Sequence, residues 1–135
     1  GKDRLAKSLK PANVGKMMGA PITVIVAHDM DFWKQLNVLF PHEDRRHMFD
    51  GKPEYCADTA YRNGTMQGTY MMLAARALGL DVGAMSGFSN AIVDEEFFAG
   101  TMLKSNFLLN IGYGDESALF QKLPRLAFEQ ACNIA

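Results

Sequence analysis

Two apolar runs of the chain have the length and composition of β-strands. Residues 22–27, ITVIVA, are almost entirely β-branched and follow one another without a polar interruption, which is typical of a strand covered on both faces. We therefore expect a central strand there. Residues 105–115 are rich in leucine and isoleucine and end at Gly112 and Gly114, which predicts a second strand. Two strands are few for a sheet, so further strands would come from outside this chain or from a partner.

A long helix is predicted between these strands. Residues 54–80 contain no proline, their apolar side chains recur mainly three or four positions apart, and Gly79 ends the pattern. The second half is apolar around most of its circumference, which favours a buried central helix. Gly64 and Gly68 lie four apart on one face, where the missing side chains would let another helix approach closely. We expect that second helix to belong to a dimer partner.

The remaining elements are predicted to be short. Residues 2–18 favour a helix broken or bent near Pro11, because proline cannot donate to the preceding turn. Ser89 or Asn90 begins a helix with Gly100 behind it. The other expected segments are a short helix at 29–40, an exposed loop at 41–54, and two short helical turns around an irregular link at 122–125.

Length, composition and charge describe one globular domain, residues 1–135. The chain is 48% apolar and 21% charged with a net charge of −1, which disfavours binding to nucleic acid. Its longest apolar run is far shorter than the roughly 20 residues of a membrane helix, and its first residues lack the pattern of a signal peptide. We expect a cytoplasmic protein that binds neither nucleic acid nor membrane.

Residues with metal-binding or nucleophilic chemistry form no convincing motif. Cys56 and Cys132 lack a CxxC spacing, so we expect reduced, buried thiols. His42 and His47 lie five apart, not the four that would place two imidazoles on one helix face, so no metal site is expected. His28 ends a strand, where a structural hydrogen bond is the simplest interpretation. Any chemistry would need an imported cofactor.

The chain leaves the long helix through a stretch of small residues, GLDVGAMSGF at 79–88. A cap alone would need fewer glycines, so this stretch predicts that something outside the chain approaches the main chain closely. Two cationic stretches accompany it: NVGKM at 13–17 and KLPR at 122–125. Each signal is weak alone.

Taken together with RALGLD, LKSNFLLNIGYGD and LPRLAFEQA, these stretches resemble the nitroreductase family of FMN-dependent oxidoreductases. The resemblance covers essentially the whole chain and is strongest to RutE-type malonic semialdehyde reductases. The family begins with a further segment that contains an arginine- and serine-rich phosphate-binding sequence. The chain as given matches the C-terminal two thirds of the family domain, so half of the phosphate site is expected to be missing.

The resemblance assigns roles to individual residues. Asn13 and Lys16 would bind the polar edge of the flavin ring, and the main chain at Ser86 and Gly87 would place an N–H against the flavin N5. Ser86 stands where the family usually has an acidic residue, so only its main chain is assigned a role. Two neighbours would lie along the ring: Ala84 and Met85.

The resemblance also places two cations against the phosphate of FMN. Arg125 matches the arginine near the C-terminus that pairs with this phosphate, a task suited to a guanidinium that donates two parallel hydrogen bonds. Lys122 is one residue out of register with the second cation of the family.

The fold and activity that the resemblance implies follow from the family. The fold is a homodimeric α+β sandwich, with a small sheet flanked by helices, FMN at the subunit interface and the long helix in the dimer core. NAD(P)H would reduce the flavin, which would then reduce a small aldehyde, malonic semialdehyde, to 3-hydroxypropionate in pyrimidine degradation. Two alternatives remain open: a general nitro- or quinone reductase, and a truncated, non-catalytic flavin-fold binding module.

Overall fold

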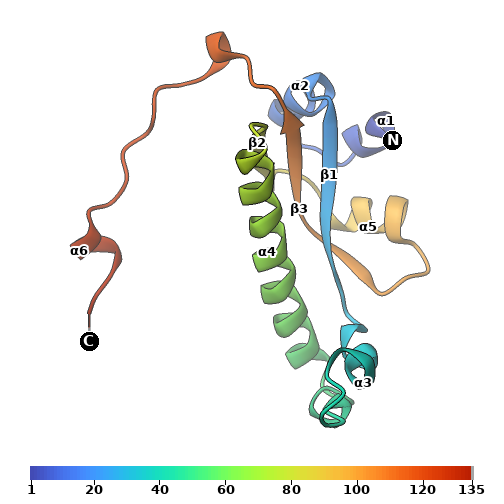
Figure 1. The fold of residues 1–135 in the computed structure, drawn as a ribbon. Helices are drawn as coiled ribbons and strands as arrows, with labels where there is room; N and C mark the ends of the chain where they lie inside the picture. Colours follow the sequence, from blue (N-terminus) through green and yellow to red (C-terminus); the bar gives the residue numbers. More distant parts are fainter. Residues whose placement is uncertain (135) are drawn as a thin grey trace.

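A computed structural model describes residues 1–134 of the protein. Its centre is a three-stranded antiparallel sheet in the order β1-β3-β2. The long helix α4 covers one face of the sheet, and three shorter helices cover the other (Figure 1). The bounds of these elements are α1 Lys2–Ala6, α2 Pro11–Gly19, β1 Ile22–Asp29, α4 Pro53–Ala77, β2 Asp81–Met85, α5 Asn90–Phe98 and β3 Leu103–Gly112.

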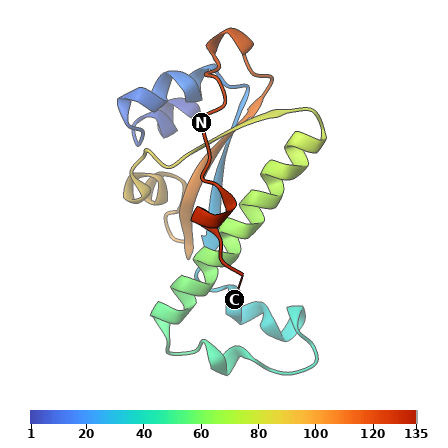
Figure 2. The ribbon, with the colours of Figure 1, turned by 90° about the vertical axis from the view of Figure 1, so that its left-hand side faces the viewer.

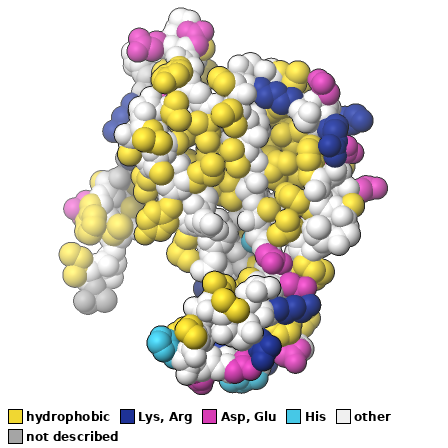
Figure 3. All heavy atoms as spheres, turned by 45° about the vertical axis from the view of Figure 1, so that its right-hand side comes forward, with side chains coloured by type: hydrophobic (Ala, Val, Ile, Leu, Met, Phe, Trp, Pro, Cys, Tyr) yellow, Lys and Arg dark blue, Asp and Glu magenta, His cyan; other side chains and the backbone are white. Residues whose placement is uncertain are grey.

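Two peripheral regions complete the chain. A lobe between β1 and α4 contains three short helices, and an arm after β3 contains two more (Figures 1 and 2). In Figure 3 the lobe carries the densest mixture of positive, negative and histidine side chains on the visible face. The helices of these regions are η1 Phe32–Gln35, α3 Leu36–Leu39, η2 Arg46–Met48, η3 Glu116–Ala118 and α6 Phe128–Ala131.

The strand at the centre of the sheet is β3, and this corrects the position expected for β1. β1 lies at an edge of the described sheet, paired only with β3, although helices cover both sides of the layer. β2 was not expected at all, because Gly83 and Asp81 lower its strand propensity and the segment was interpreted as a loop. Its pairing with β3, from Asp81 opposite Gly112 to Met85 opposite Leu108, makes it a strand.

The alternation of β3 divides the core into two clusters. Leu108 faces the short helices and packs with Leu5, Met17 and Val93, whereas the next residue, Leu109, faces α4. Both leucines are fully buried, at 0% exposure. Successive side chains of a strand point to opposite faces, so this one strand holds both helical layers on the sheet.

The two glycines of α4 serve the contact with the sheet, and their expected role in a helix–helix contact is wrong. A Cβ at Gly68 would lie 2.6 Å from Cζ of Phe107 and 2.9 Å from Cγ1 of Val26. A Cβ at Gly64 would lie 2.9 Å from Cβ of His28. The missing side chains therefore let α4 approach β1 and β3 of its own chain.

The opposite face of α4 is exposed within the chain, so the expectation of a buried helix holds for one face only. Tyr70 is 74% exposed and Leu73 is 61% exposed. The expectation of buried cysteines also holds in part. Cys56 is buried, and its Sγ lies 3.3 Å from the carbonyl oxygen of Phe49. Cys132 is exposed on the arm, so the expected burial is wrong there. Among the described helices, none is both long and apolar enough to cross a bilayer.

The arm begins at a fixed point and then leaves the body. The Gly114 N–H donates to Oδ2 of Asp81 at 2.7 Å, and this hydrogen bond holds the pKa of Asp81 below its ordinary value. Beyond that point the chain runs on the outer side of α4 (Figures 1 and 2). Large apolar side chains of the arm face outward, including Phe120, which is 93% exposed.

Substitution of Gly68 tests its contact with the sheet. We expect Gly68→Ala to lower the free energy of unfolding by about 1–2 kcal/mol, because overpacking outweighs the better helix propensity of alanine. Gly15→Ala is the matched control, since a Cβ at Gly15 meets nothing within 4 Å in α2, and it should raise stability by up to about 1 kcal/mol. Urea unfolding measures both. Changes of the same sign would contradict this account of Gly68.

His28 lies at the end of β1, edge-on to the ring of Tyr61 at a centroid distance of 5.7 Å. Among residues 1–134, its buried Nδ1 has no hydrogen-bond partner, so the expected structural hydrogen bond is not made by that atom. Burial lowers the pKa of His28; the Asp94 carboxylate acts in the opposite direction, and the Lys104 ammonium adds to the lowering.

The lowered pKa predicts a pH dependence of stability. The unfolded chain binds a proton on His28 near the ordinary pKa of about 6.5, before the folded protein does. The free energy of unfolding should therefore fall as the pH drops below that value, until the lowered pKa of the folded state is reached. His28→Gln should flatten this slope in urea titrations between pH 7.5 and pH 5, values chosen about one unit or more on either side of the ordinary pKa. His47→Gln, a change on the exposed lobe, should leave it unaltered.

Candidate functional site

Main-chain hydrogen bonds join the start of α2 to the segment after β2. The Ser89 N–H donates to the Ser8 carbonyl at 2.8 Å, and the Lys10 N–H donates to the Gly87 carbonyl at 2.9 Å. Residues 8–10 and 87–89 thus run side by side, antiparallel. This junction, which we call the clasp, brings together two stretches that are more than 70 residues apart in the sequence, as the Asn13–Gly87 separation of 74 shows.

Asn13 reinforces the clasp from the first turn of α2. Its Nδ2 donates to the Gly87 carbonyl at 3.2 Å. A Cβ at Gly87 would collide with that same nitrogen, so any other residue there would displace the Asn13 amide from its hydrogen bond. The structure therefore brings together Asn13 and Gly87, two residues that the sequence placed in one site.

Lys16 lies one turn further along α2, exposed, at the wall of a cavity of about 530 Å³. Gly83 and Asn110 also line this cavity, so it extends from α2 to the sheet. Asn110 fixes the distance between them: its Nδ2 donates to the Lys16 carbonyl at 3.1 Å, and its Oδ1 accepts from Thr23 Oγ1 at 2.7 Å. Among residues 1–134 the Lys16 ammonium has no hydrogen-bond or ion-pair partner.

The residues between Gly83 and Gly87 present main chain and small side chains to the outside. Ala84 and Ser86 are exposed. Met85 packs against the cluster of Leu5 and Leu108, so only its main chain can face a ligand. Within the described chain, the N–H groups of Ser86 and Gly87 donate no hydrogen bond. Two main-chain donors are thus available next to Asn13.

The two cations of the C-terminal stretch lie elsewhere in the chain. Lys122 and Arg125 are exposed on the arm, which Figure 1 shows leaving the body on the far side of α4 from α2. Within residues 1–134 the Arg125 guanidinium donates to two neighbouring carbonyls, those of Leu123 at 3.0 Å and Pro124 at 3.2 Å. A single copy of the chain does not bring these cations to the clasp.

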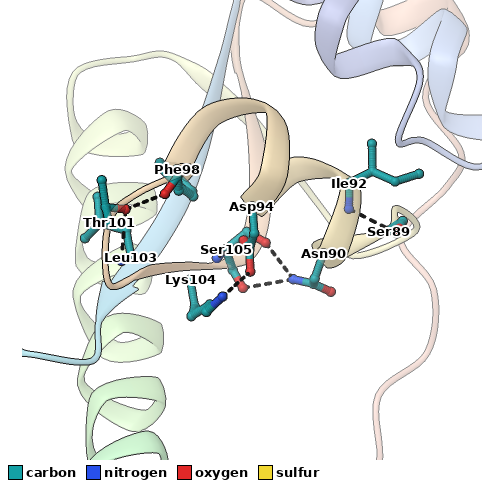
Figure 4. A network of polar contacts seen from close by, with 9 residues as sticks. All are labelled: Ser89, Asn90, Ile92, Asp94, Phe98, Thr101, Leu103, Lys104 and Ser105. Carbon is teal, nitrogen blue, oxygen red and sulfur yellow. Dashed lines mark hydrogen bonds and ion pairs between the residues drawn. The ribbon is translucent and has the colours of Figure 1, made fainter.

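A polar network joins Asp94 of α5 to Lys104 and Ser105 of β3 (Figure 4). Asp94 Oδ1 accepts from the Ser105 N–H at 2.8 Å, and its Oδ2 lies 3.5 Å from the Lys104 ammonium. Asn90 donates to Oγ of Ser105 at 2.9 Å and to its carbonyl at 2.8 Å. Asp94 therefore anchors α5 to β3.

The histidines of the lobe have local partners. His47 Nδ1 lies 2.9 Å from the Asp44 carbonyl, and His42 packs edge-on to Phe40. Asp44 binds the Arg46 guanidinium, which lowers its pKa to about 2. No group of three or more potential metal-ligating side chains occurs among the described residues.

Comparison with known proteins places this geometry in a family. No protein-family model matches the chain. A protein of Xanthomonas oryzae pv. oryzae named "Putative NADH dehydrogenase/NAD(P)H nitroreductase" is 57% identical over 134 residues, which cover 99% of this chain and 68% of the relative. A protein of the same name from Stenotrophomonas maltophilia strain R551-3 is 56% identical over the same shares. The chain belongs to the nitroreductase family.

Solved structures confirm the nitroreductase-like α+β fold. A structure from Exiguobacterium sibiricum, described as a putative nitroreductase in complex with FMN, superposes with a TM-score of 0.84 at 20% identity, over 99% of this chain and 71% of that one. A nitroreductase-type protein of Bacillus subtilis superposes with a TM-score of 0.81 at 17% identity, over 99% and 72%. At these identities the likeness concerns the fold alone.

Two participants in this nitroreductase site were missed in the sequence. Asn110 interrupts an apolar strand with an amide, and that polar position in a buried run was a usable signal. Lys10 acts through its main-chain N–H, which leaves no mark on the type of side chain. The pairing that brings it to Gly87 exists only in the folded chain.

Proposed function

We propose that this nitroreductase is an FMN-dependent NAD(P)H oxidoreductase. The observation that carries the proposal is the pair of N–H groups at exposed Ser86 and half-buried Gly87, which donate to no group of residues 1–134 and lie next to Asn13. The names of the relatives and the FMN complex of a structural neighbour support it. A protein from Staphylococcus epidermidis with the same fold is described as an NAD(P)H:FMN oxidoreductase, at a TM-score of 0.81 and 15% identity.

The residues at the clasp fit the ring of FMN. Glycine and alanine at positions 83, 84 and 87 leave the main chain accessible to a flat ligand, and Lys16 offers a positive charge at the adjacent wall. When bound, FMN supplies reversible hydride chemistry that no side chain can provide. The main-chain N–H groups donate to acceptor atoms of the ring, and Lys16 stabilises negative charge on the polar edge.

The phosphate end of the ligand requires a second copy of the chain. Arg125 and Lys122 cannot serve the clasp of their own chain, but the arm that carries them exposes a row of large apolar residues that need covering. A groove of about 580 Å³ between β1 and α4, lined by Val24, Val26 and Met71 among others, is a matching apolar surface. We propose a homodimer in which each arm lies on the other copy.

The second substrate we propose is a small carbonyl compound such as malonic semialdehyde. Its support is the resemblance of the motifs LKSN, NIGYGD and LPR to those of RutE-type enzymes. The alternative is a general nitro- or quinone reductase, which the names of the relatives favour. Free cysteines at positions 56 and 132 support a reducing, cytoplasmic setting for either activity.

Anaerobic titration tests the proposed activity. The protein, supplied with FMN, should be yellow, should lose its colour on addition of NADPH or NADH, and should regain it with the second substrate. Steady-state rates with malonic semialdehyde, nitrofurazone and menadione should rank the aldehyde first. A higher rate with nitrofurazone or menadione would support the general reductase. A protein that binds no FMN and oxidises no NAD(P)H would indicate the non-catalytic module.

Removal of the arm guanidinium tests the phosphate role. Arg125→Ala should weaken FMN binding by about 2 kcal/mol, roughly thirtyfold, if the guanidinium pairs with a phosphate away from water. Arg62→Ala, which removes an exposed arginine of α4 paired with Asp58, is the control and should leave binding unchanged. Fluorescence titration of FMN measures both, and equal affinities would remove Arg125 from the site.

Mixed dimers test whether a second copy supplies that guanidinium. Gly87→Val should abolish FMN binding at the clasp of its own chain, because the valine side chain would displace the Asn13 amide and cover the main chain proposed to contact the ring. A dimer of one Arg125→Ala chain and one Gly87→Val chain would then contain one intact site and one doubly damaged site. We expect one tightly bound FMN per mixed dimer. No tight binding would indicate that both residues act in the same chain.

A further inference from the structure

We propose that Asn13 is a positioning residue that orients the main-chain donor of Gly87, in addition to any contact it makes with a ligand. The inference rests on the proposed function, since the oriented donor is aimed at bound flavin. It depends on three hydrogen bonds that converge on the two peptide units around Gly87.

The peptide unit between Gly87 and Phe88 is held from one side. Its carbonyl accepts from the Lys10 N–H at 2.9 Å and from Asn13 Nδ2 at 3.2 Å. Its N–H, that of Phe88, donates back to the Ser86 carbonyl at 3.0 Å. Both the carbonyl oxygen and the N–H of this peptide unit are therefore hydrogen-bonded. The unit cannot rotate without breaking these hydrogen bonds.

The peptide unit between Ser86 and Gly87 is fixed as a consequence. Its carbonyl accepts from Phe88, and the described chain contains no cis peptide bond. In a trans peptide the C=O and N–H point in opposite directions. The Gly87 N–H therefore points away from Phe88, and it is the group that remains without a protein partner in residues 1–134.

Asn13 supplies the constraint that glycine lacks. Gly87 does not have a positive φ, so its backbone conformation does not require glycine. A Cβ there would displace the amide of Asn13. Glycine has more backbone freedom than any other residue type, and the hydrogen bond from Asn13 restricts that freedom. Donation to a carbonyl also identifies the amide end as Nδ2, which leaves Oδ1 as an acceptor.

The direction of the Gly87 N–H affects how easily the ring is reduced. A main-chain N–H aimed at a ring atom that gains electron density stabilises the reduced state more than the oxidised state. Preorganised donors are effective because they need no reorganisation when charge develops. Loss of the Asn13 hydrogen bond should therefore lower the reduction potential of the bound flavin as well as its affinity.

Amide hydrogen exchange without FMN separates positioning from direct contact. In the FMN-free protein, Asn13→Ala should accelerate exchange at the amides of Lys10 and Phe88 about tenfold or more, a loss comparable to one hydrogen bond of about 1–1.5 kcal/mol. Exchange at the amides of β3 should not change. Lys16→Ala is the matched control: it removes a cation from the same helix face and should leave the Lys10 and Phe88 amides unaltered.

The loaded protein provides the second readout. Asn13→Ala and Asn13→Asp should both weaken FMN binding and shift the midpoint potential to more negative values, since neither can donate to the Gly87 carbonyl. Unchanged exchange at Lys10 and Phe88 alongside weakened FMN binding would show that Asn13 acts by ligand contact alone, and would overturn the inference. Wild-type protein that binds no FMN would instead overturn the proposed function and this inference with it.

Discussion

The burial of both faces of β3 is the constraint on which the rest of this nitroreductase depends. Leu108 and Leu109 are adjacent in the sequence, fully buried, and face opposite layers of helices. Because side chains alternate along a strand, a single strand can hold two layers only when both of its faces are apolar. β1 and β2 pair with it on either side, so every layer of the chain is positioned relative to β3.

The geometry of the candidate site depends on β3. Pairing of Met85 with Leu108 ends β2 just before exposed Ser86 and half-buried Gly87. The same face of the sheet carries the cluster that seats α1 and α2, so the segment after β2 emerges directly beside the start of α2. The clasp then needs only main-chain hydrogen bonds and one amide side chain. Small residues at the site leave room for a ligand, and the core behind it keeps the backbone in place.

Some apolar surfaces are buried within one copy of the chain, and others are left exposed. The sheet, its two covering layers and the clasp form within the described chain, whereas the outer face of α4 and the arm expose large side chains such as Tyr70 and Phe120. The cations assigned to the phosphate lie on that same arm. In the function we propose, affinity for the ring and affinity for the phosphate would be carried by different surfaces, and association of two copies would couple them.

The sequence by itself determined the elements whose signals are local: the extent of α4 up to Gly79, the break at Pro11, the cap at Ser89, and the family to which its motifs point. It could not determine β2, whose strand conformation comes from pairing with β3, nor the edge position of β1. It also misassigned Gly64 and Gly68, because a glycine pair on a helix says that something comes close without saying what. Only the tertiary structure decided that these glycines face Val26, His28 and Phe107, and that Asn13 meets Gly87, since contacts between distant residues depend on how the layers pack.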